Sequence, residues 1–364
     1  MPKLVDTTIR LLGQEPLAGR MPTADVLQLA GILDEAGFGL LEISGGGVFD
    51  TAVRRGVESP WERIRAIHAR TKTPLGMALR GRFLVGSRPV DGDFVQRFVS
   101  AAAENGIDVF RLHDPLNDVS NLREAAEAIE ASGRELNAGL VYSPGATGET
   151  EALLEQARKL PDLGAARVVL HDPTGSLQPH RARELVERVS EASGLPVGVY
   201  CQGASGNALA AALEAARAGA DLIGCAVYPV ALALHRVSGE GLAQALSGLG
   251  LECSVDVAAL WRAAEHKLPP GLVAALDVHL RAYAASDRLD DVLEELERIR
   301  VEVGSPPLAA PIGQILASQA LLNVLSANRY GTLVDELRAF GNRSRQLPQG
   351  LLKAAARPDS LSSF

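Results

Sequence analysis

Several polar side chains in this sequence can bind an anion or transfer a proton, and each stands at or soon after the end of a short apolar run. Arg10 and Arg80 carry guanidinium groups, which bind carboxylate or phosphate in a bidentate manner. His113, His171 and His235 carry imidazoles, which gain and lose protons near neutral pH. The remaining candidates carry an amide or a phenol, namely Gln14, Gln202 and Tyr200. Two arginines directed into one site would indicate an anionic ligand.

The elements that must position these side chains alternate regularly. Short runs rich in β-branched residues recur, and each is followed by a segment with the apolar period of an amphipathic helix. Eight strands are predicted, at Lys3–Arg10, Leu40–Ser44, Leu75–Arg80, Val109–Asp114, Leu136–Tyr142, Ala166–Asp172, Pro196–Gln202 and Leu222–Val227. Helices are predicted between them, for example at Thr23–Ala36, Pro60–Arg70, Asp93–Glu104 and Arg181–Ala192.

This alternation favours a closed barrel. A doubly wound open sheet would share the pattern, but the sequence has no dinucleotide-binding glycine fingerprint. We therefore predict an α/β fold, a TIM (β/α)8 barrel, over residues 1–250. Residues 251–342 predict an all-helical extension and residues 343–364 a tail. The helices expected in the extension are Ala258–Glu265, Gly271–Ala285, Leu289–Val303 and Ile312–Val324.

The functional side chains of a TIM barrel lie at the carboxyl ends of its strands, so we expect the candidate residues to share one mouth. An alternative is that the arginines pair with Glu42, Asp114 or Asp172 and only brace the barrel. The run from Gly45 to Gly47 lacks the Lys-Ser/Thr of a phosphate loop and opens no evident helix. We interpret this run as a plain turn.

A zinc site is a further alternative for the mouth. His113, His171 and Cys201 could supply three ligands. They come from three different strands, however, and no local ligand spacing supports the assignment.

Composition limits the classes of partner. The chain has 364 residues, 47% of them hydrophobic, and a formal net charge of -8. This acidity argues against nucleic acid or an anionic membrane as partner. No apolar run is long enough to span a membrane, and no signal peptide is expected at the start. The three cysteines are unclustered, which is typical of reduced thiols, and we expect a cytoplasmic location.

The sequence also resembles a known family over almost its whole length and in the right order. The opening Asp6-Thr7-Thr8-Ile9-Arg10 with Gln14, the runs LRGRFLVG and AAENGIDVFRLHDPLNDVSNL, and the C-terminal KLPPGLVAAL and RYGTLVDEL carry the likeness. They are similar to the carboxyltransferase domain of pyruvate carboxylase, the oxaloacetate decarboxylase alpha subunit and the transcarboxylase core subunit, which form a DRE-TIM-like family.

The resemblance implies chemistry on a 2-oxo or β-keto acid. Members of this family move a carboxyl group between carboxybiotin and pyruvate, or decarboxylate oxaloacetate, at a divalent metal that stabilises an enolate. The positions matching the family's substrate-binding residues are Arg10, Gln14 and Arg80. The resemblance also implies a homodimer.

The metal ligands of the family are replaced. Its aspartate after the first-strand arginine corresponds to Leu11, its bridging lysine to His171, and its His-x-His pair to Tyr200 and Gln202. Because leucine cannot coordinate a cation, the family metal is not expected. The sequence also lacks a Met-Lys-Met biotin-attachment motif. Any carboxybiotin must therefore be supplied by a separate biotin-carrier protein.

Three hypotheses follow. The first is a divergent carbon–carbon lyase or carboxyltransferase in which side chains replace the metal. His171, Tyr200 and His235 would be the catalytic groups, with a protonated His171 supplying positive charge, and His113 and Gln202 would contact substrate. The second is a non-catalytic subunit or binding module. The third is a metal enzyme with a relocated site.

Overall fold

The structure is a computed structural model. It describes residues 1–15, 21–55, 58–84, 89–145, 149–203, 206–260, 270–308, 311–326, 328–335 and 337. The chain divides into two compact units, Met1–Leu260 and Trp261–Phe364. Within the described residues, no helix is both long enough and apolar enough to cross a membrane.

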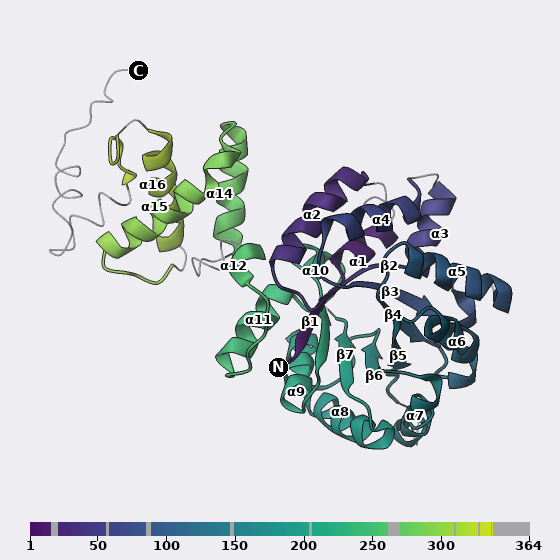
Figure 1. The fold of residues 1–364 in the computed structure, drawn as a ribbon. Helices are drawn as coiled ribbons and strands as arrows, with labels where there is room; N and C mark the ends of the chain where they lie inside the picture. Colours follow the sequence, from purple (N-terminus) through teal and green to yellow (C-terminus); the bar gives the residue numbers. More distant parts are fainter. Residues whose placement is uncertain are drawn as a thin grey trace. The chain divides into compact units, whose positions relative to one another are not determined.

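The first unit is a closed barrel of eight parallel strands, each hydrogen-bonded to the next in sequence order and the last to the first. The TIM-barrel prediction is therefore confirmed (Figure 1). The strands are β1 (Lys3–Asp6), β2 (Leu40–Gly45), β3 (Leu75–Arg80), β4 (Val109–His113), β5 (Glu135–Val141), β6 (Arg167–Asp172), β7 (Val197–Cys201) and β8 (Leu222–Cys225).

Helices surround the strands and bury their apolar faces against them (Figure 1). They are α1 (Thr8–Gln14), α2 (Thr23–Glu35), α3 (Gly46–Arg55), α4 (Pro60–Arg70), α5 (Gly92–Glu104), α6 (Arg123–Ala131), α7 (Glu149–Ala157), α8 (Pro179–Ser193), α9 (Gly206–Arg217), α10 (Val230–Ala233), α11 (Gly239–Gly248) and α12 (Val257–Leu260).

A second buried cluster is built from strand residues alone, which places it inside the barrel. It joins Val5, Leu40, Val169, Tyr200 and Leu222 from five different strands. Because successive strand residues point to opposite faces, each strand supplies one layer to this interior and another to the helices. This interior layer lies beneath the mouth and fixes Tyr200 in place.

The first strand is shorter than predicted. The sequence suggested an extended run to Arg10, but the strand ends at Asp6 and Thr8 begins α1. The Asp6 carboxylate accepts hydrogen bonds from the backbone N–H and the hydroxyl of Thr8, at 2.9 and 2.7 Å. The first backbone N–H groups of a helix have no partner within the helix, and Asp6 supplies one for Thr8. The same bonds hold the turn from the strand into the helix. Arg10 and Gln14, four residues apart, therefore lie on one face of a helix.

The glycine run after β2 also differs from the prediction. Rather than forming a plain turn, Gly46 opens the ten-residue helix α3. Small residues are required here because the space is occupied. A Cβ on Gly45 would lie 2.7 Å from the carbonyl oxygen of Ala78, and one on Gly47 would lie 3.2 Å from the Gln14 amide nitrogen. The amino end of α3 consequently reaches the mouth of the barrel.

The second unit is helical in its described part. It contains α14 (Pro270–Ala282), α15 (Leu289–Glu302) and α16 (Ile312–Leu325), which pack around an apolar core including Leu280, Leu296 and Leu316. The predicted helix Ala258–Glu265 extends beyond the described residues, and the predicted tail 343–364 lies wholly outside them.

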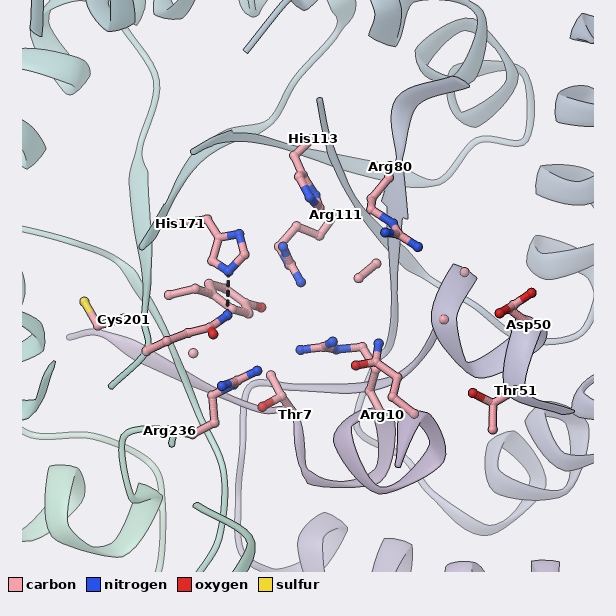
Figure 2. A pocket seen from close by; sticks show the side chains of 17 residues that line it. Thr7, Arg10, Asp50, Thr51, Arg80, Arg111, His113, His171, Cys201 and Arg236 are labelled. Carbon is pink, nitrogen blue, oxygen red and sulfur yellow. Dashed lines mark hydrogen bonds between the residues drawn. The ribbon is translucent and has the colours of Figure 1, made fainter. Parts of the chain in front are cut away.

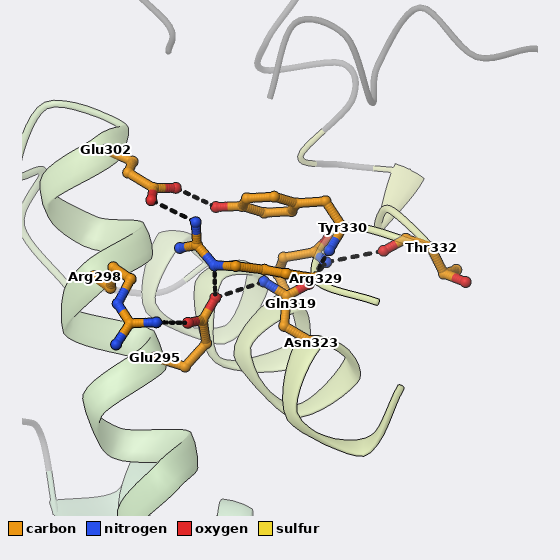
Figure 3. Close-up of polar contacts among 8 residues, drawn as sticks. All are labelled: Glu295, Arg298, Glu302, Gln319, Asn323, Arg329, Tyr330 and Thr332. Carbon is orange, nitrogen blue, oxygen red and sulfur yellow. Dashed lines mark hydrogen bonds and ion pairs between the residues drawn. The ribbon is translucent and has the colours of Figure 1, made fainter. Parts of the chain in front are cut away.

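A buried polar network links α15 and α16 to the segment that follows them (Figure 3). Glu295 accepts hydrogen bonds from Asn323 and Arg329, both at 2.7 Å, and from Arg298 at 3.2 Å. Gln319 bonds Asn323 at 2.8 Å and the Thr332 carbonyl at 2.9 Å. Since the Glu295 carboxylate has three donors around it, its burial between the helices is compensated.

Candidate functional site

A cavity of about 440 Å³ lies at the carboxyl ends of the barrel strands (Figure 2). Seven of the eight residues singled out from the sequence line it, namely Arg10, Gln14, Arg80, His113, His171, Tyr200 and Gln202. The eighth, His235, is not among the lining residues, whereas its neighbour Arg236 is. The fold therefore brings nearly the whole predicted set into one site.

The barrel register determines which of these side chains are neighbours. Arg80 on β3 is level with His113 on β4, and His171 on β6 is level with Tyr200 on β7. Each pair therefore stands at the same height in the mouth. Arg10 enters the same space from α1 rather than from a strand.

Glu42 at the base of the cavity joins two arginines. Its carboxylate accepts from Arg111 Nε at 2.8 Å and Nη2 at 3.0 Å, and it lies 2.5 Å from Arg10 Nε. Tyr200 donates to it over 3.4 Å, and the Arg111 guanidinium lies 4.4 Å above the Tyr200 ring. Burial alone would raise the pKa of Glu42, but the charges and hydrogen bonds of Arg111 and Arg10 lower it to about 2. Glu42 is therefore ionised.

The alternative that the arginines only brace the barrel holds in part. Arg10 does pair with Glu42. The Asp172 carboxylate instead accepts from backbone amides of its own loop, including Gly175 at 3.0 Å and Leu177 at 2.9 Å. Asp114 likewise accepts from the amide of Leu116 at 2.8 Å. Within the described residues, neither aspartate neutralises an arginine of the cavity.

The Arg80 guanidinium forms no ion pair or hydrogen bond in the described part of the chain. Its guanidinium lies on the side of the cavity facing α3 (Figure 2). The Gln14 amide lies at the same end, against Gly47. This end of the cavity therefore presents a cation and an amide to a bound group.

The two cavity histidines are neutral at physiological pH. Burial, together with the charges of Arg111 and Arg80, lowers the pKa of His113 to about 3. Burial and the charge of Arg111 likewise hold the pKa of His171 well below its ordinary value. The expectation that a protonated His171 supplies positive charge is therefore wrong, because burial and the charges of Arg111 and Arg10 disfavour the protonated ring. The cationic groups here are guanidiniums.

The tautomer of His171 follows from its partner. Its Nε2 lies 2.8 Å from Gln202 Nε2, so an amide that donates there requires the ring proton on Nδ1. His171 Nδ1 and His113 Nδ1 are both buried without a hydrogen-bond partner among the described residues. The two rings meet edge to face, with centroids 5.7 Å apart. These ring nitrogens can hydrogen-bond a molecule in the cavity.

The donor set does not fit the divalent metal of the resembling family. Leu11, at the first ligand position, is buried against Ala226 and Ala231. Burial and the neighbouring Glu42 raise the pKa of Tyr200 far above its usual range, so the phenol stays protonated. Tyr200 and the amide of Gln202 therefore offer only weak donors to a cation.

The relocated zinc site is not supported either. Among the described residues, no three His, Cys, Asp or Glu side chains are placed to hold a metal ion. Burial and the charge of Asp172 raise the pKa of Cys201 to about 12, so this thiol does not ionise at neutral pH. The Cys201 sulfur points away from the histidines (Figure 2).

Two of the arginines that line the cavity, Arg111 and Arg236, were missed from the sequence. Arg111 stands two residues before His113 on β4 and shares its face, so strand periodicity could have identified it. Arg236 could not be found in this way because it follows a turn. His235 has φ 54°, and its carbonyl accepts from the backbone N–H of Gly203 at 3.0 Å. This left-handed turn presents Arg236, rather than His235, to the cavity.

Comparisons with known proteins agree with this architecture. Residues 1–266 match the HMGL-like family model, and residues 264–352 match the conserved carboxylase domain. The chain is 35% identical to a subunit of the pyruvate carboxylase of Methanocaldococcus jannaschii, over 93% of this chain and 64% of that protein. It is 28% identical to the methylmalonyl-CoA carboxyltransferase 5S subunit of Propionibacterium freudenreichii, over 88% of this chain and 69% of that protein.

A solved structure gives the same result. The carboxyl transferase domain of Rhizobium etli pyruvate carboxylase with pyruvate is 26% identical, with a TM-score of 0.67 over 99% of this chain and 66% of that chain. The chain spans about two thirds of the length of the curated relatives it matches. It belongs to the HMGL-like family, in the branch whose barrel is followed by a conserved carboxylase domain.

Proposed function

We propose that this chain is a divergent enzyme of the carboxyl-transfer kind, acting on a 2-oxo or β-keto acid without the family's metal. One observation carries the proposal. The Arg111 Nη1 atom is buried and has no hydrogen-bond partner among the described residues, although it belongs to a charged group at the cavity. An unpaired buried donor of this kind is costly in the empty protein and is compensated when an acceptor binds.

Carboxylate binding is assigned to one end of the cavity. Arg80 supplies the charge there, and the Gln14 amide supplies a hydrogen bond. The amino end of α3 adds backbone N–H groups, which favour a negatively charged group. Arg10, on the same helix face as Gln14, faces the body of the substrate.

The chemical step is assigned to the other cations. When the bond to the departing carboxyl group breaks, CO2 leaves, and the electron pair of that bond moves toward the carbonyl and leaves negative charge on its oxygen. The enolate then takes up a proton from water to give the product. Arg111 and Arg10 stabilise this enolate, and the Nδ1–H of His171 donates a hydrogen bond to it. A fixed donor of this type contributes about 3 kcal/mol to a transition state in well-studied enzymes. In the transfer direction, the carboxyl group would be exchanged with carboxybiotin on a separate carrier protein.

A non-catalytic binding module is the second candidate. It is favoured by the neutral state of both histidines, because neither can protonate an enolate carbon at physiological pH as a strong acid. Such a module would bind the same acids without turning them over. A homodimer remains a prediction for either function.

The test is decarboxylation of β-keto acids, including oxaloacetate, in buffer containing EDTA, which suppresses the metal-catalysed background. We expect CO2 release above the rate without protein, and its loss in Arg80→Ala. Arg82→Ala is the matched control, because the Arg82 side chain is exposed and, among the described residues, its ion pair is a long one of 3.9 Å with Glu124. Binding without turnover would favour the binding module, and neither binding nor turnover would refute both.

A further inference from the structure

A fourth arginine of the cavity has a role that binding a single carboxylate does not explain. Arg236 is held in place by its own loop, since its backbone bridges Gln202 and its Nη1 donates to the carbonyls of Leu234 at 2.6 Å and His235 at 3.2 Å. Nε and Nη2 form no hydrogen bond or ion pair to the described residues. The side chain is thus fixed with one edge available to the cavity.

The charges around the cavity are unbalanced. Among the described residues, four arginines line the cavity, whereas one carboxylate, Asp50, lines it and Glu42 pairs with Arg10 and Arg111. Asp50 already pairs with Arg54 at 2.7 Å, and Glu42 is shared by two of the four arginines. At least two positive charges are therefore without a counter-charge among the described residues. Consistent with this, burial and the charges of Arg10 and Arg111 lower the pKa of Arg236 to about 10.

The uncompensated charges lie at two places. Figure 2 shows the guanidinium groups of Arg10, Arg111 and Arg236 converging on the centre of the cavity, whereas Arg80 lies apart on the side of α3. Like charges that converge in a partly buried space repel one another, and an anion between them removes that penalty. The unpartnered Nη1 of Arg111, on a side chain that is 5% exposed, belongs to this central group.

We propose that the cavity binds a dianion, with a second anion subsite formed by Arg236 and Arg111. This rests on the function proposed above, in which Arg80 and Gln14 bind the first carboxylate. The substrate class is then a 2-oxo acid that carries a second carboxylate or a phosphate group at its far end. The cavity of about 440 Å³ is in the size range of pockets that hold ligands well beyond three carbons.

The experiment compares two five-carbon acids that differ at one end. Isothermal titration calorimetry of the full chain, in chelator-treated buffer, would use 2-oxopentanoate and 2-oxoglutarate. We expect the wild type to bind 2-oxoglutarate at least tenfold more tightly. Arg236→Gln should bring the two affinities within about twofold of each other and leave 2-oxopentanoate binding unchanged. Arg236→Lys should retain part of the preference, because it keeps the charge but not the bidentate geometry.

The outcomes separate this proposal from the one on which it rests. The second subsite is overturned if the wild type binds both acids equally, or if Arg236→Gln keeps the preference for 2-oxoglutarate. The first proposal still stands in either case if Arg80→Ala weakens the binding of both acids. No binding of either acid overturns both proposals. An analogue with a phosphonate in place of the distal carboxylate distinguishes the two sources of the second charge. Urea unfolding of Arg236→Gln and Arg236→Lys verifies that each variant is folded.

Discussion

Replacing Glu42 by glutamine is expected to destabilise the barrel by about 3 kcal/mol at neutral pH. Glutamine has nearly the same shape as glutamate, so the change removes the negative charge that holds Arg10 and Arg111 and little else. Both arginines are almost wholly buried. They would remain in the cavity as cations without a counter-charge, which is the costly way to break a buried ion pair.

The magnitude follows from the pKa of Glu42. In the folded protein its pKa is lowered from 4.5 to about 2. At about 1.36 kcal/mol for each pH unit, this corresponds to roughly 3 kcal/mol in favour of the ionised form. A value in that range also agrees with the roughly 3–5 kcal/mol found when one partner of a buried pair is removed. The contribution is present above pH 4.5 and is lost as the pH falls toward 2.

The assay is urea unfolding of the wild type and Glu42→Gln between pH 3 and pH 7. Trp61, which packs against Phe49 and Phe98, reports on the barrel by fluorescence. The difference in unfolding free energy should be largest at pH 7 and shrink below pH 4.5. Glu151→Gln is the control, because Glu151 is 68% exposed in its pair with Arg188 and its loss should change stability by less than about 1 kcal/mol.

Two results would refute this reasoning. A loss below about 1 kcal/mol at pH 7 would mean that the arginines do not depend on Glu42 for compensation. A loss of the expected size that stays constant down to pH 3 would mean that shape, rather than charge, is responsible.

Three further predictions follow from the same structure. Burial raises the pKa of Asp6 to about 7 despite the hydrogen bonds from Thr8. The unfolding free energy of the wild type should therefore fall by up to about 4 kcal/mol as the pH rises from 4 to 7. Asp6→Asn should remove this pH dependence, which is measured by urea unfolding. Removal of metal by EDTA should leave the thermal stabilisation by 2-oxoglutarate unchanged, because the donor set does not fit a divalent ion; a fall after chelation would contradict the metal-free site. Glu295→Gln should destabilise the C-terminal unit by about 2 kcal/mol, since three donors lose their charged acceptor, and an unchanged circular-dichroism melting curve would count against it.

Periodicity and local signals in the sequence were sufficient for the architecture. Eight apolar runs separated by amphipathic segments are compatible with only a few sheet topologies. The order of the strands in the barrel follows from their order in the chain. The positions of Arg80, His113, His171, Tyr200 and Gln202 then follow as well. A side chain at the carboxyl end of a barrel strand has to face the mouth.

The predictions of local structure were wrong where a contact of one residue outweighed the apolar pattern. The apolar run through Ile9 resembles a strand, yet Asp6 binds Thr8 and starts a helix. The glycine run from Gly45 to Gly47 resembles a turn, yet Gly46 begins α3, and Gly45 and Gly47 lie too close to Ala78 and Gln14 for a side chain. Both outcomes depend on contacts with residues that the periodicity does not describe.

The electrostatic character of the site was decided by the tertiary structure alone. The sequence names histidines, but their protonation depends on burial and on arginines brought from other strands. Arg111 and Arg236 stand far apart in the chain, and only barrel closure places both beside Glu42 and Arg10. Charge interactions act through space and strengthen with burial, so their sum cannot be obtained from residue types and spacing. The sequence therefore determined the barrel and seven of the residues that line its mouth, and the fold determined that the mouth is a cationic site.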